Sequence, residues 1–415
     1  MKKSIKRHLA AYIRQMDRLD FRVIACLILL NAFGLIMIYS ASAYGCSMSK
    51  EYGFDSAYLL KKQAIFVVLG FVAMLLVRRI NYNWFRKLSV PIFIAGIVMI
   101  FLLKTSLGVS SHGATRWLKI GPMQVQVAEI VKIALVIALA AFITKYQEQI
   151  QRIPVMVLYV WILLTGIPAI LVYELSDNLS SAIILIGIAY LLTFVMTNHP
   201  IFHIVLGGGA VAGIVVARNY LMQHLPTQAQ LDKMQFRYGR IYAWLSPETY
   251  ADSYGFQPLQ GLYAVASGGL IGRGLGNSIQ KLEKIPEAQN DMIFSIVCEE
   301  LGIVGAGVLL AMFAFLVYHL IRIAANSENT FGRVLTLGIA FHIALQVLIN
   351  VGVVLTMIPN TGVSLPFISY GGSAVLFTMI EMGMALSVDR IHMERSVQRK
   401  RMELEKEWEE NNPKG

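Results

Sequence analysis

The stretch FRVIACLILLNAFGLIMIYSAS, residues 21–42, decides the fold class. It follows a basic leader and has the roughly 20 mainly apolar residues that a membrane-spanning helix needs. Because helix bundles satisfy their backbone hydrogen bonds internally, apolar runs of this length are a good guide to membrane proteins. The sequence therefore predicts an all-α polytopic membrane protein. About ten transmembrane helices are expected, at 21–42, 62–78, 88–104, 125–144, 154–174, 179–198, 201–218, 291–321, 331–357 and 364–388.

The composition excludes two other classes of protein. Of the 415 residues, 56% are hydrophobic and 15% are charged, and the mean hydropathy is +0.60. Soluble domains carry roughly 45–50% apolar and about 25% charged residues, so an ordinary soluble protein and a disordered one are both excluded. The three cysteines show no spacing pattern, which argues against a disulfide framework and a cysteine metal site.

Lysine and arginine residues predict the orientation of the chain. The net charge is +11, and residues 1–22 and 389–415 each carry seven of these residues, whereas 358–363 carries none. Cytoplasmic loops collect Lys and Arg, so we expect cytoplasmic termini and no nucleic-acid partner. The chain then divides into a cytoplasmic basic leader (1–20), a membrane domain (21–388) and a charged cytoplasmic tail. The leader either lies on the anionic inner leaflet as an amphipathic helix or is a solvated topology signal.

The loop between the seventh and eighth predicted helices, residues 219–290, is about 70 residues long and far exceeds usual connections. It carries basic residues on the side that is usually poor in them, and a second external loop, 105–124, carries more. Arg and Lys form strong charge-assisted hydrogen bonds with phosphate. The sequence therefore predicts an anionic ligand, such as a phosphate or pyrophosphate, on the outer side. The candidate cations are Arg116, Arg237, Arg240 and Lys281.

Glu129 and Lys132 are ionisable residues inside the fourth predicted span. They lie three positions apart and therefore share one helix face. Charged groups at this depth are costly and usually face the interior of a bundle. Two interpretations remain open: a structural ion pair that neutralises itself, or a pair that lines a polar cavity.

A glycine-rich stretch, SGGLIGRGLGNSIQK (267–281), precedes the eighth predicted span. No predicted strand comes before it and no P-loop Lys-Ser/Thr follows, which excludes a nucleotide-binding loop. Glycine allows tight turns and close backbone contact. We therefore expect a re-entrant or surface-lying element.

Asp291 ends the same loop, directly before an apolar run. One interpretation is that it caps the eighth helix. The other is that it acts as a general base at the outer membrane surface, beside the basic residues. Glu283 and Glu287 lie nearby, and paired carboxylates are the groups that hold a divalent cation such as Mg²⁺ or Mn²⁺. The spacing of these acids does not decide whether a metal binds.

The segment IPNTGVSLPFISYGGSA (358–374) is rich in turn residues and lies between two predicted spans. Irregular backbone at membrane depth is tolerated only where protein or a water-filled cavity covers it. Either the segment is a kinked helix start without a ligand, or Ser369, Tyr370 and Ser373 offer hydroxyl groups to such a cavity.

Three long motifs, in this order, resemble the SEDS (shape, elongation, division and sporulation) family: GATRWLKIGPMQVQVAEIVK (113–132), GFQPLQGLYAVASGGLIGRGLGNSIQKLEKIPEAQNDMIFSIVCEELG (255–302) and PNTGVSLPFISYGGS (359–373). The resemblance implies a ten-helix glycosyltransferase of the bacterial plasma membrane. Such an enzyme polymerises lipid II, the undecaprenyl-pyrophosphate-linked disaccharide pentapeptide, into glycan strands during cell division or elongation. The implied partners are lipid II, membrane lipids and a class B penicillin-binding protein that crosslinks the strands.

The resemblance also implies roles for individual residues. Asp291 matches the family's essential carboxylate, and it would accept the proton of the attacking sugar hydroxyl as a general base. Glu129 and Lys132 match a buried acid–base pair. Cationic side chains would stabilise the leaving pyrophosphate. The residues expected to bind substrate are Arg116, Trp117, Arg237, Arg240, Lys281, Glu283, Ser369 and Tyr370.

Some positions depart from the family pattern. The family often has His-Thr before the aspartate, where this chain has Gln289 and Asn290, and its Gln-Pro-Asp-Leu-Gly-Thr motif reads SDNLSS at 176–181. Two further functions are weighed: a lipid II flippase or transporter, and a noncatalytic scaffold for a class B penicillin-binding protein. Transporters usually show internal repeats, and none is visible in this sequence. A scaffold has no need of Asp291 as an acid.

Overall fold

The computed structural model describes residues 19–111, 114–121, 123–231, 233–234, 236–282 and 285–411. Within these ranges the chain is predominantly helical, as the sequence predicts. Two predictions fall outside the described residues: the basic leader, apart from its last two positions, and the substrate-binding role of Glu283.

The long helices follow the predicted spans. They are α2 (Leu19–Met48), α3 (Tyr58–Arg79), α5 (Ser89–Leu102), α6 (Val127–Lys145), α10 (Leu179–Met196), α11 (Pro200–Gln223), α15 (Ile293–Asn326), α16 (Thr330–Val354) and α17 (Gly372–Asn411). The fifth predicted span is composite, with a π-helical turn between two α-helical pieces: α8 (Pro154–Tyr159), η2 (Val160–Gly166) and α9 (Ile167–Ser176). The connecting elements are η1 (Lys50–Tyr52), α4 (Asn83–Lys87), α7 (Gln147–Arg152), α12 (Gln228–Leu231), α13 (Phe236–Leu245) and α14 (Phe256–Gly268).

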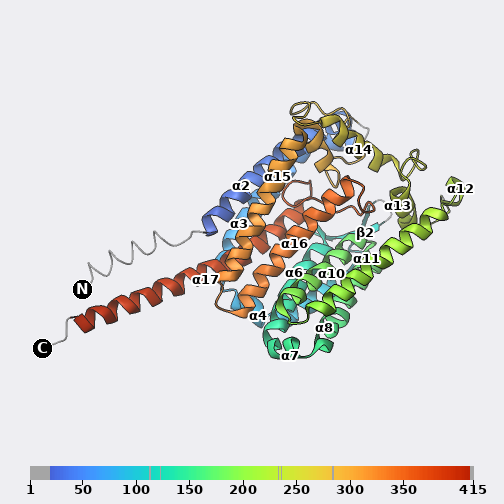
Figure 1. The fold of residues 1–415 in the computed structure, drawn as a ribbon. Helices are drawn as coiled ribbons and strands as arrows, with labels where there is room; N and C mark the ends of the chain where they lie inside the picture. The colour runs from blue at the N-terminus through green and yellow to red at the C-terminus, as the bar shows by residue number, and fades with distance from the viewer. Residues whose placement is uncertain are drawn as a thin grey trace.

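In the described part of the chain, 8 helices are long and apolar enough to cross a membrane. Helix α5 is apolar but shorter. Helix α17 begins within the bundle and continues far beyond it, so the predicted boundary at residue 388 falls inside one continuous helix (Figure 1). The chain is therefore a multi-pass membrane protein, and the total of ten crossings stays a prediction.

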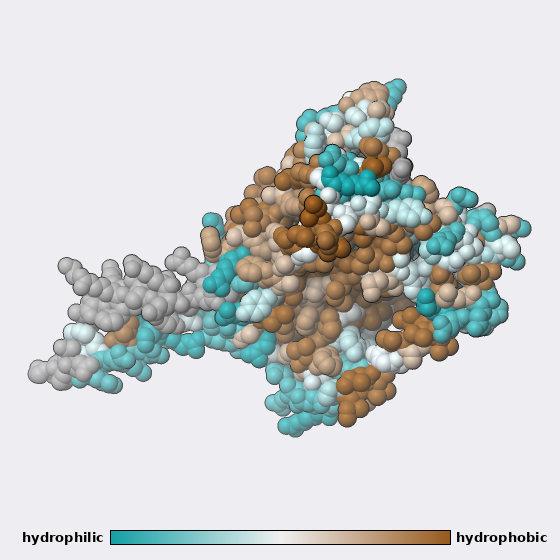
Figure 2. Space-filling view, turned by 45° about the horizontal axis from the view of Figure 1, so that its top comes forward, coloured by the Kyte–Doolittle hydropathy of each residue, from teal (hydrophilic) through white to brown (hydrophobic). Residues whose placement is uncertain are grey.

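Helix α3 shows how a span is divided between protein and lipid. Val67 and Met74 on one face are buried, whereas Ile65 and Val68 on the other are 60% and 62% exposed. Large apolar side chains left exposed in this way mark a surface that contacts another apolar phase. In Figure 2 apolar side chains cover the middle of the visible face, and polar side chains gather towards its extremities. This is the distribution that a surrounding bilayer requires.

Short elements lie at the two ends of the bundle. Figure 1 places α12, α13 and α14 at one end and α4 and α7 at the other. At the α4 end, Arg78 Nη2 lies 2.6 Å from Asp20 Oδ2, and Arg390 donates to the carbonyl oxygen of Arg79 at 3.1 Å. The start of α2, the end of α3 and the middle of α17 therefore meet at one end. This agrees with the expectation that the basic segments share one side.

The loop at 105–124 contains a small sheet that the sequence analysis did not predict. Three antiparallel strands follow in the order β1 (Gly108–Ser111), β2 (Ala114–Ile120) and β3 (Met123–Gln126). Trp117 on the central strand pairs with Val109 on one side and Gln126 on the other. Because Gln126 is also the residue that precedes α6, the sheet is joined directly to the start of that helix. The hydrophobic runs dominate this sequence, and strands as short as these leave little signal beside them.

The predicted start of the tenth helix at residue 364 is wrong. The backbone from 364 to 371 is irregular, Phe367 has φ of +64°, and α17 begins at Gly372. The turn residues of this motif override its apolar character, and the segment lies at the wall of a cavity described below.

The glycine-rich stretch forms a tight turn pressed onto α15. A Cβ atom on Gly268 would clash with the carbonyl oxygen of Cys298, and one on Gly272, where φ is +79°, would clash with the carbonyl of Glu300. Only glycine tolerates both this backbone conformation and this approach. The predicted close backbone contact is therefore present.

Candidate active site

A cavity of about 580 Å³ lies among the ends of several helices. Its walls come from the start of α3, strands β2 and β3, the first turns of α6, α10 and α17, helix α13, and the segment that leads into α15. Polar and charged side chains line much of it. These elements are far apart in the sequence, so the cavity exists only in the folded chain.

Asp291 lies in this cavity, two residues before α15 begins. The cap position of α15 belongs to Met292, and no side chain makes a capping hydrogen bond there. The capping interpretation of Asp291 is therefore not supported. The carbonyl oxygen of Asp291 accepts a hydrogen bond from Asn350 Nδ2 at 2.8 Å, which ties this residue to α16.

Two arginines converge with Asp291 beside Gly362. A Cβ atom placed on Gly362 would lie 3.7 Å from Asp291 Oδ2 and 3.9 Å from each of Arg116 Nη1 and Arg240 Nη1. The three charged tips therefore surround one point on the cavity wall. They are supplied by the segment before α15, strand β2 and helix α13.

Burial raises the pKa of Asp291 to about 6, and Glu287 adds to this effect, whereas Arg240 and Arg116 oppose it. Burial also lowers the pKa of Arg240, which Asp291 counteracts. A carboxyl with a pKa near the working pH is suited to exchange protons, because it is both available and reactive as a base. The chemistry of the site therefore fits a general base beside two cations.

Arg116 is fixed by a second segment of the cavity. Its Nη2 donates to the carbonyl oxygen of Asp177 at 2.9 Å, and Asp177 ends α9 with φ of +50°. Asn178 then caps α10, because its side-chain oxygen accepts a hydrogen bond from the backbone N–H of Ser181 at 3.0 Å. Asn178 and Ser181 both line the cavity. Sequence reasoning treated this stretch only as a departure from the family motif. An Asn placed three residues before a Ser at a helix start was the signal available for the cap.

Glu129 and Lys132 form the expected ion pair, with Glu129 Oε1 2.8 Å from Lys132 Nζ. Their side chains are 5% and 1% exposed, and both residues border the cavity. Lys132 also donates to Gln346 Oε1 at 3.2 Å, and Gln346 Nε2 donates to the carbonyl of Ser364 at 3.1 Å. The two interpretations left open by the sequence are therefore compatible, because the pair is both internally matched and part of the cavity floor.

Only some of the hydroxyl residues of the motif at 364–374 line the cavity. Tyr370 and Ser373 line the cavity, and the backbone N–H of Tyr370 donates to the carbonyl of Gln289 at 2.8 Å. Ser369 is 2% exposed, and its hydroxyl accepts from the backbone N–H of Leu365 at 2.7 Å. Ser369 therefore holds the turn, and its substrate-binding role finds no support in this geometry.

The remaining predicted site residues differ in whether they reach the cavity. Trp117 lines the cavity next to Arg116. The side chain of Arg237 is outside what the structure describes, although its backbone belongs to α13. Lys281 does not border the cavity: its Nζ lies 2.8 Å from Glu300 Oε1, in a separate cluster.

Lys62 is a cavity residue that sequence reasoning missed. It lies on α3 at the cavity wall and has an exposed side chain. The sequence analysis placed it at the edge of the second span and counted it with neither loop nor site. The pair Lys61-Lys62 directly before an apolar run was the available signal.

The sequence left open whether the protein binds a divalent metal ion. Among the described residues, no group of three or more His, Cys, Asp and Glu side chains is placed to hold a metal ion. Glu287 and Asp291 do line the same cavity. Mg²⁺ is commonly bound by one or two carboxylates together with substrate phosphates, so Glu287 is a candidate ligand for such an ion.

The fold and the site together define a class: a polytopic membrane protein with a charged cavity at one end of its bundle. Residues 21–394 match the family model FtsW/RodA/SpoVE, described as cell cycle protein, and the chain belongs to this family. It is 34% identical to the probable peptidoglycan glycosyltransferase FtsW of Geobacter metallireducens, over 91% of this chain and 96% of that protein. It is 33% identical to the stage V sporulation protein E of Bacillus subtilis, over 89% of this chain and 97% of that one.

Solved structures share the fold. A chain of a peptidoglycan synthase complex, studied for the structural coordination of polymerization and crosslinking, gives a TM-score of 0.68 at 24% identity, over 89% of this chain and 97% of that one. RodA, a rod shape determining protein of Thermus thermophilus, gives 0.60 at 23% identity, over 89% of this chain and 95% of RodA.

Proposed function

We propose that this protein is a peptidoglycan glycosyltransferase that polymerises lipid II into glycan strands, with Asp291 as the general base. The observation that carries the proposal is the convergence of Asp291 Oδ2 with the guanidinium groups of Arg116 and Arg240 beside Gly362. Membership of a family whose curated members are named peptidoglycan glycosyltransferases supports the reaction class.

The proposed step joins two sugars. The hydroxyl oxygen of the acceptor bonds to the anomeric carbon of the donor, and the bond from that carbon to the pyrophosphate oxygen breaks. The hydroxyl proton passes to the Asp291 carboxylate, and the leaving pyrophosphate keeps the electron pair. Arg116 and Arg240 stabilise the negative charge that develops on the leaving oxygen, as preorganised cations do in other transfer reactions.

A divalent cation has a defined place in this proposal. Glu287, which lines the same cavity, is the residue that would hold it, together with the phosphates of the donor. When bound, such an ion neutralises pyrophosphate charge. We expect chelation by EDTA to lower polymerisation and added Mg²⁺ or Mn²⁺ to restore it. Full activity in EDTA would show that the two arginines suffice.

The proposal includes an orientation and partners. The cavity end faces outward and the α4 end faces the cytoplasm of a bacterial cell, which places both termini inside. The lipid chains of the donor remain in the bilayer, and a class B penicillin-binding protein crosslinks the product. The FtsW/RodA fold found in a synthase complex that coordinates polymerization and crosslinking supports this pairing.

The experiment that tests the function is lipid II polymerisation by purified wild type and Asp291→Asn, each with and without the partner penicillin-binding protein. Asn preserves the size of the side chain but cannot accept the proton, so we expect activity to fall by at least roughly 10²-fold. The matched control is Asp252→Asn, because Asp252 is an exposed carboxylate of the same connecting region. If Asp291→Asn polymerises lipid II, Asp291 is not the general base. If the wild type transports lipid II across the membrane without polymerising it, the alternative function as a transporter is favoured.

A further inference from the structure

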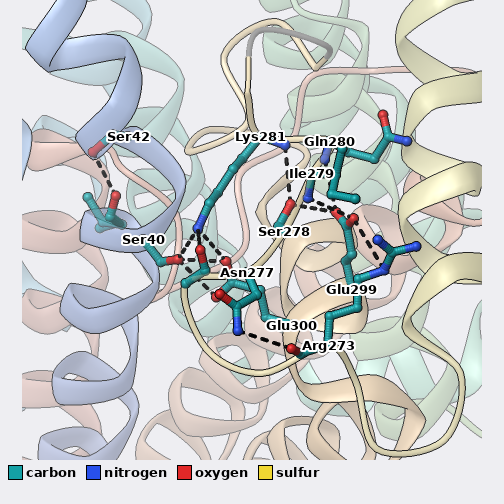
Figure 3. A network of polar contacts seen from close by, with 12 residues as sticks. Ser40, Ser42, Arg273, Asn277, Ser278, Ile279, Gln280, Lys281, Glu299 and Glu300 are labelled. Carbon is teal, nitrogen blue, oxygen red and sulfur yellow. Dashed lines mark hydrogen bonds and ion pairs between the residues drawn. The ribbon is translucent and has the colours of Figure 1, made fainter.

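Two consecutive glutamates of α15, Glu299 and Glu300, are both completely buried. They do not border the cavity. Buried carboxylates are costly unless they are paired and hydrogen-bonded. Figure 3 shows that both are, and that their partners come from the turn at 273–281 and from α2.

Glu300 holds Lys281 against α2. Its Oε1 lies 2.8 Å from Lys281 Nζ, and Ser40 on α2 donates to Oε1 and Oε2 at 2.7 and 2.9 Å. The Lys281 ammonium also donates to Ser40 Oγ at 3.0 Å and to the carbonyl of Gly276 at 2.6 Å. An ammonium has three N–H donors, so these contacts use its full capacity. Lys281 is therefore occupied by protein and has no donor left for a substrate.

Glu299 holds the backbone of the same turn. It accepts from Ser278 Oγ at 2.5 Å and from the backbone N–H groups of Ile279 and Gln280 at 3.0 and 3.3 Å. The backbone N–H of Arg273 donates to the carbonyl of Glu299 at 3.0 Å. The turn is thus attached to α15 by main chain and side chains together. These hydrogen bonds fix which residues of the turn lie against Glu299 of α15.

The chain after Lys281 returns to α15 at Asp291, nine residues before Glu300. The described part of this return carries Ile285 and Ala288, both 3% exposed, and cavity residues Pro286 and Glu287. A helix rises 1.5 Å per residue, so the part of α15 from its start at Ile293 to Glu300 is roughly 10 Å long. The segment that forms one wall of the cavity is held by Asn350 at the carbonyl of Asp291, by the backbone N–H of Tyr370 at the carbonyl of Gln289, and by Gln257 at the carbonyl of Pro286. At its other end the backbone N–H of Ile285 donates to the carbonyl of Gln280, in the turn that Lys281 ends.

We propose that Lys281, Glu300 and Ser40 form a latch that positions the Asp291 wall of the cavity, and that Lys281 is a positioning residue and not a substrate ligand. The expected loss of polymerisation rate rests on the proposed function, whereas the expected change in hydrogen exchange does not. Releasing the latch loosens the turn to which Ile285, at one end of the wall segment, is hydrogen-bonded. Pro286 and Glu287 then shift, water reaches Asp291, and the carboxylate is held less accurately against the acceptor.

The test compares Lys281→Gln, Glu300→Gln and the double variant, with Lys50→Gln as control. Lys50→Gln makes the same change of residue type at an exposed position of η1, outside the turn and the cavity. Hydrogen exchange over residues 285–291 and the pH dependence of polymerisation are measured for each protein. Ser40→Ala, which removes one hydroxyl, is the milder variant if a charge change prevents folding.

We expect the Lys281→Gln and Glu300→Gln variants to exchange faster over 285–291 and to lose roughly 10²-fold in kcat with little change in KM, because misplacement by an ångström has that effect. The double variant is expected to lose no more than either single one, since paired residues act non-additively. A hydrated Asp291 titrates closer to its ordinary range, so the acidic limb of the activity profile moves to lower pH. Lys50→Gln is expected to match wild type in all three measurements.

Unchanged exchange over 285–291 in Lys281→Gln would overturn the latch. Faster exchange with an unchanged kcat and pH profile would overturn its positioning role, and a rise in KM alone would return Lys281 to the substrate. If the wild type does not polymerise lipid II, the proposed function fails. Hydrogen exchange then still decides whether the latch exists.

Discussion

At the scale of single residues, Asp291 acquires its chemistry from neighbours that are distant in the sequence. Burial lifts its pKa to about 6, and Arg240 and Arg116 keep it from rising further. In the proposed reaction the same two arginines stabilise the leaving pyrophosphate. One small residue, Gly362, leaves the space in which these three groups meet.

The pH dependence of polymerisation follows from this pKa. The base works when ionised, so activity should fall about tenfold per pH unit below roughly pH 6. The positive charge of Arg240 lowers the pKa of Asp291, so Arg240→Gln should raise it. The remaining activity of this variant should therefore have its acidic midpoint at a higher pH than that of wild type. The measurement is kcat/KM between pH 4.5 and 8.5. A wild-type profile that stays flat down to pH 4.5 would contradict the assignment, because a carboxyl with the ordinary pKa of 3.8 is still mostly ionised there.

Gly362→Ala tests the meeting point directly. The residue has φ of +70°, and an added Cβ would stand within 4 Å of all three charged groups. We expect a cost of about 1–2 kcal/mol for the backbone and a loss of roughly 10²-fold in activity from displaced groups. Gly209→Ala is the control, because a Cβ there meets nothing within 4 Å. Equal activity of the two variants would show that the space beside Gly362 is not used.

At the scale of elements, the cavity is assembled from helix starts and from the irregular segment before α17. The Glu129–Lys132 pair joins the first turn of α6 to Gln346 on α16, and Gln346 in turn holds Ser364. The sheet β1–β3 leads into the same turn of α6 and carries Arg116 and Trp117. A change at this pair is therefore expected to affect three elements together.

Glu129→Gln or Lys132→Gln should destabilise the protein by about 3–5 kcal/mol, because each leaves an unpaired buried charge. The swap Glu129→Lys with Lys132→Glu keeps the pair and should cost less than either single change. Thermal unfolding in detergent measures the difference. Glu405→Gln on α17, which removes a pair with side chains 64% and 39% exposed, should stay within about 0.5 kcal/mol. Equal losses in the single and swapped variants would argue against mutual pairing.

At the scale of the whole molecule, helix α13, which contributes Arg240 to the cavity, and helix α4, which follows the basic residues Arg78 and Arg79, lie at opposite ends of the bundle (Figure 1). Apolar side chains cover the middle of the face seen in Figure 2. In the proposed orientation the basic end of the bundle faces the cytoplasm. A lipid-linked donor would then reach the cavity from the outer leaflet, and growing glycan would leave on the outside.

Cysteine labelling in cells tests this orientation. Glu248→Cys and Lys406→Cys each place a thiol at an exposed position, one between α13 and α14 and one in the tail. The three native cysteines are buried, which keeps the background low. A membrane-impermeant maleimide should label the first variant in intact cells and the second only after permeabilisation. The reverse pattern would invert the topology and place the cavity in the cytoplasm.

Hydropathy and motif spacing were enough to predict the helices and to select Asp291, Arg116, Arg240 and the Glu129–Lys132 pair. Such signals are local or lie within one motif. The sequence did not reveal the role of Lys62 or of the stretch at 176–181, because both become site residues only through packing. Lys281 was misplaced for the same reason, since a charge in a conspicuous loop says nothing about which partner satisfies it.

The sequence by itself determined that the chain crosses the membrane many times, because long apolar runs have no other stable environment. It also predicted that both basic terminal segments lie on one side of the membrane. Only the tertiary structure decided which charged groups meet: Asp291 faces Arg116 and Arg240, and Lys281 faces Glu300. The reason is physical. Burial of an apolar helix depends on its own composition, whereas burial of a charge depends on a partner that another part of the chain must bring to it.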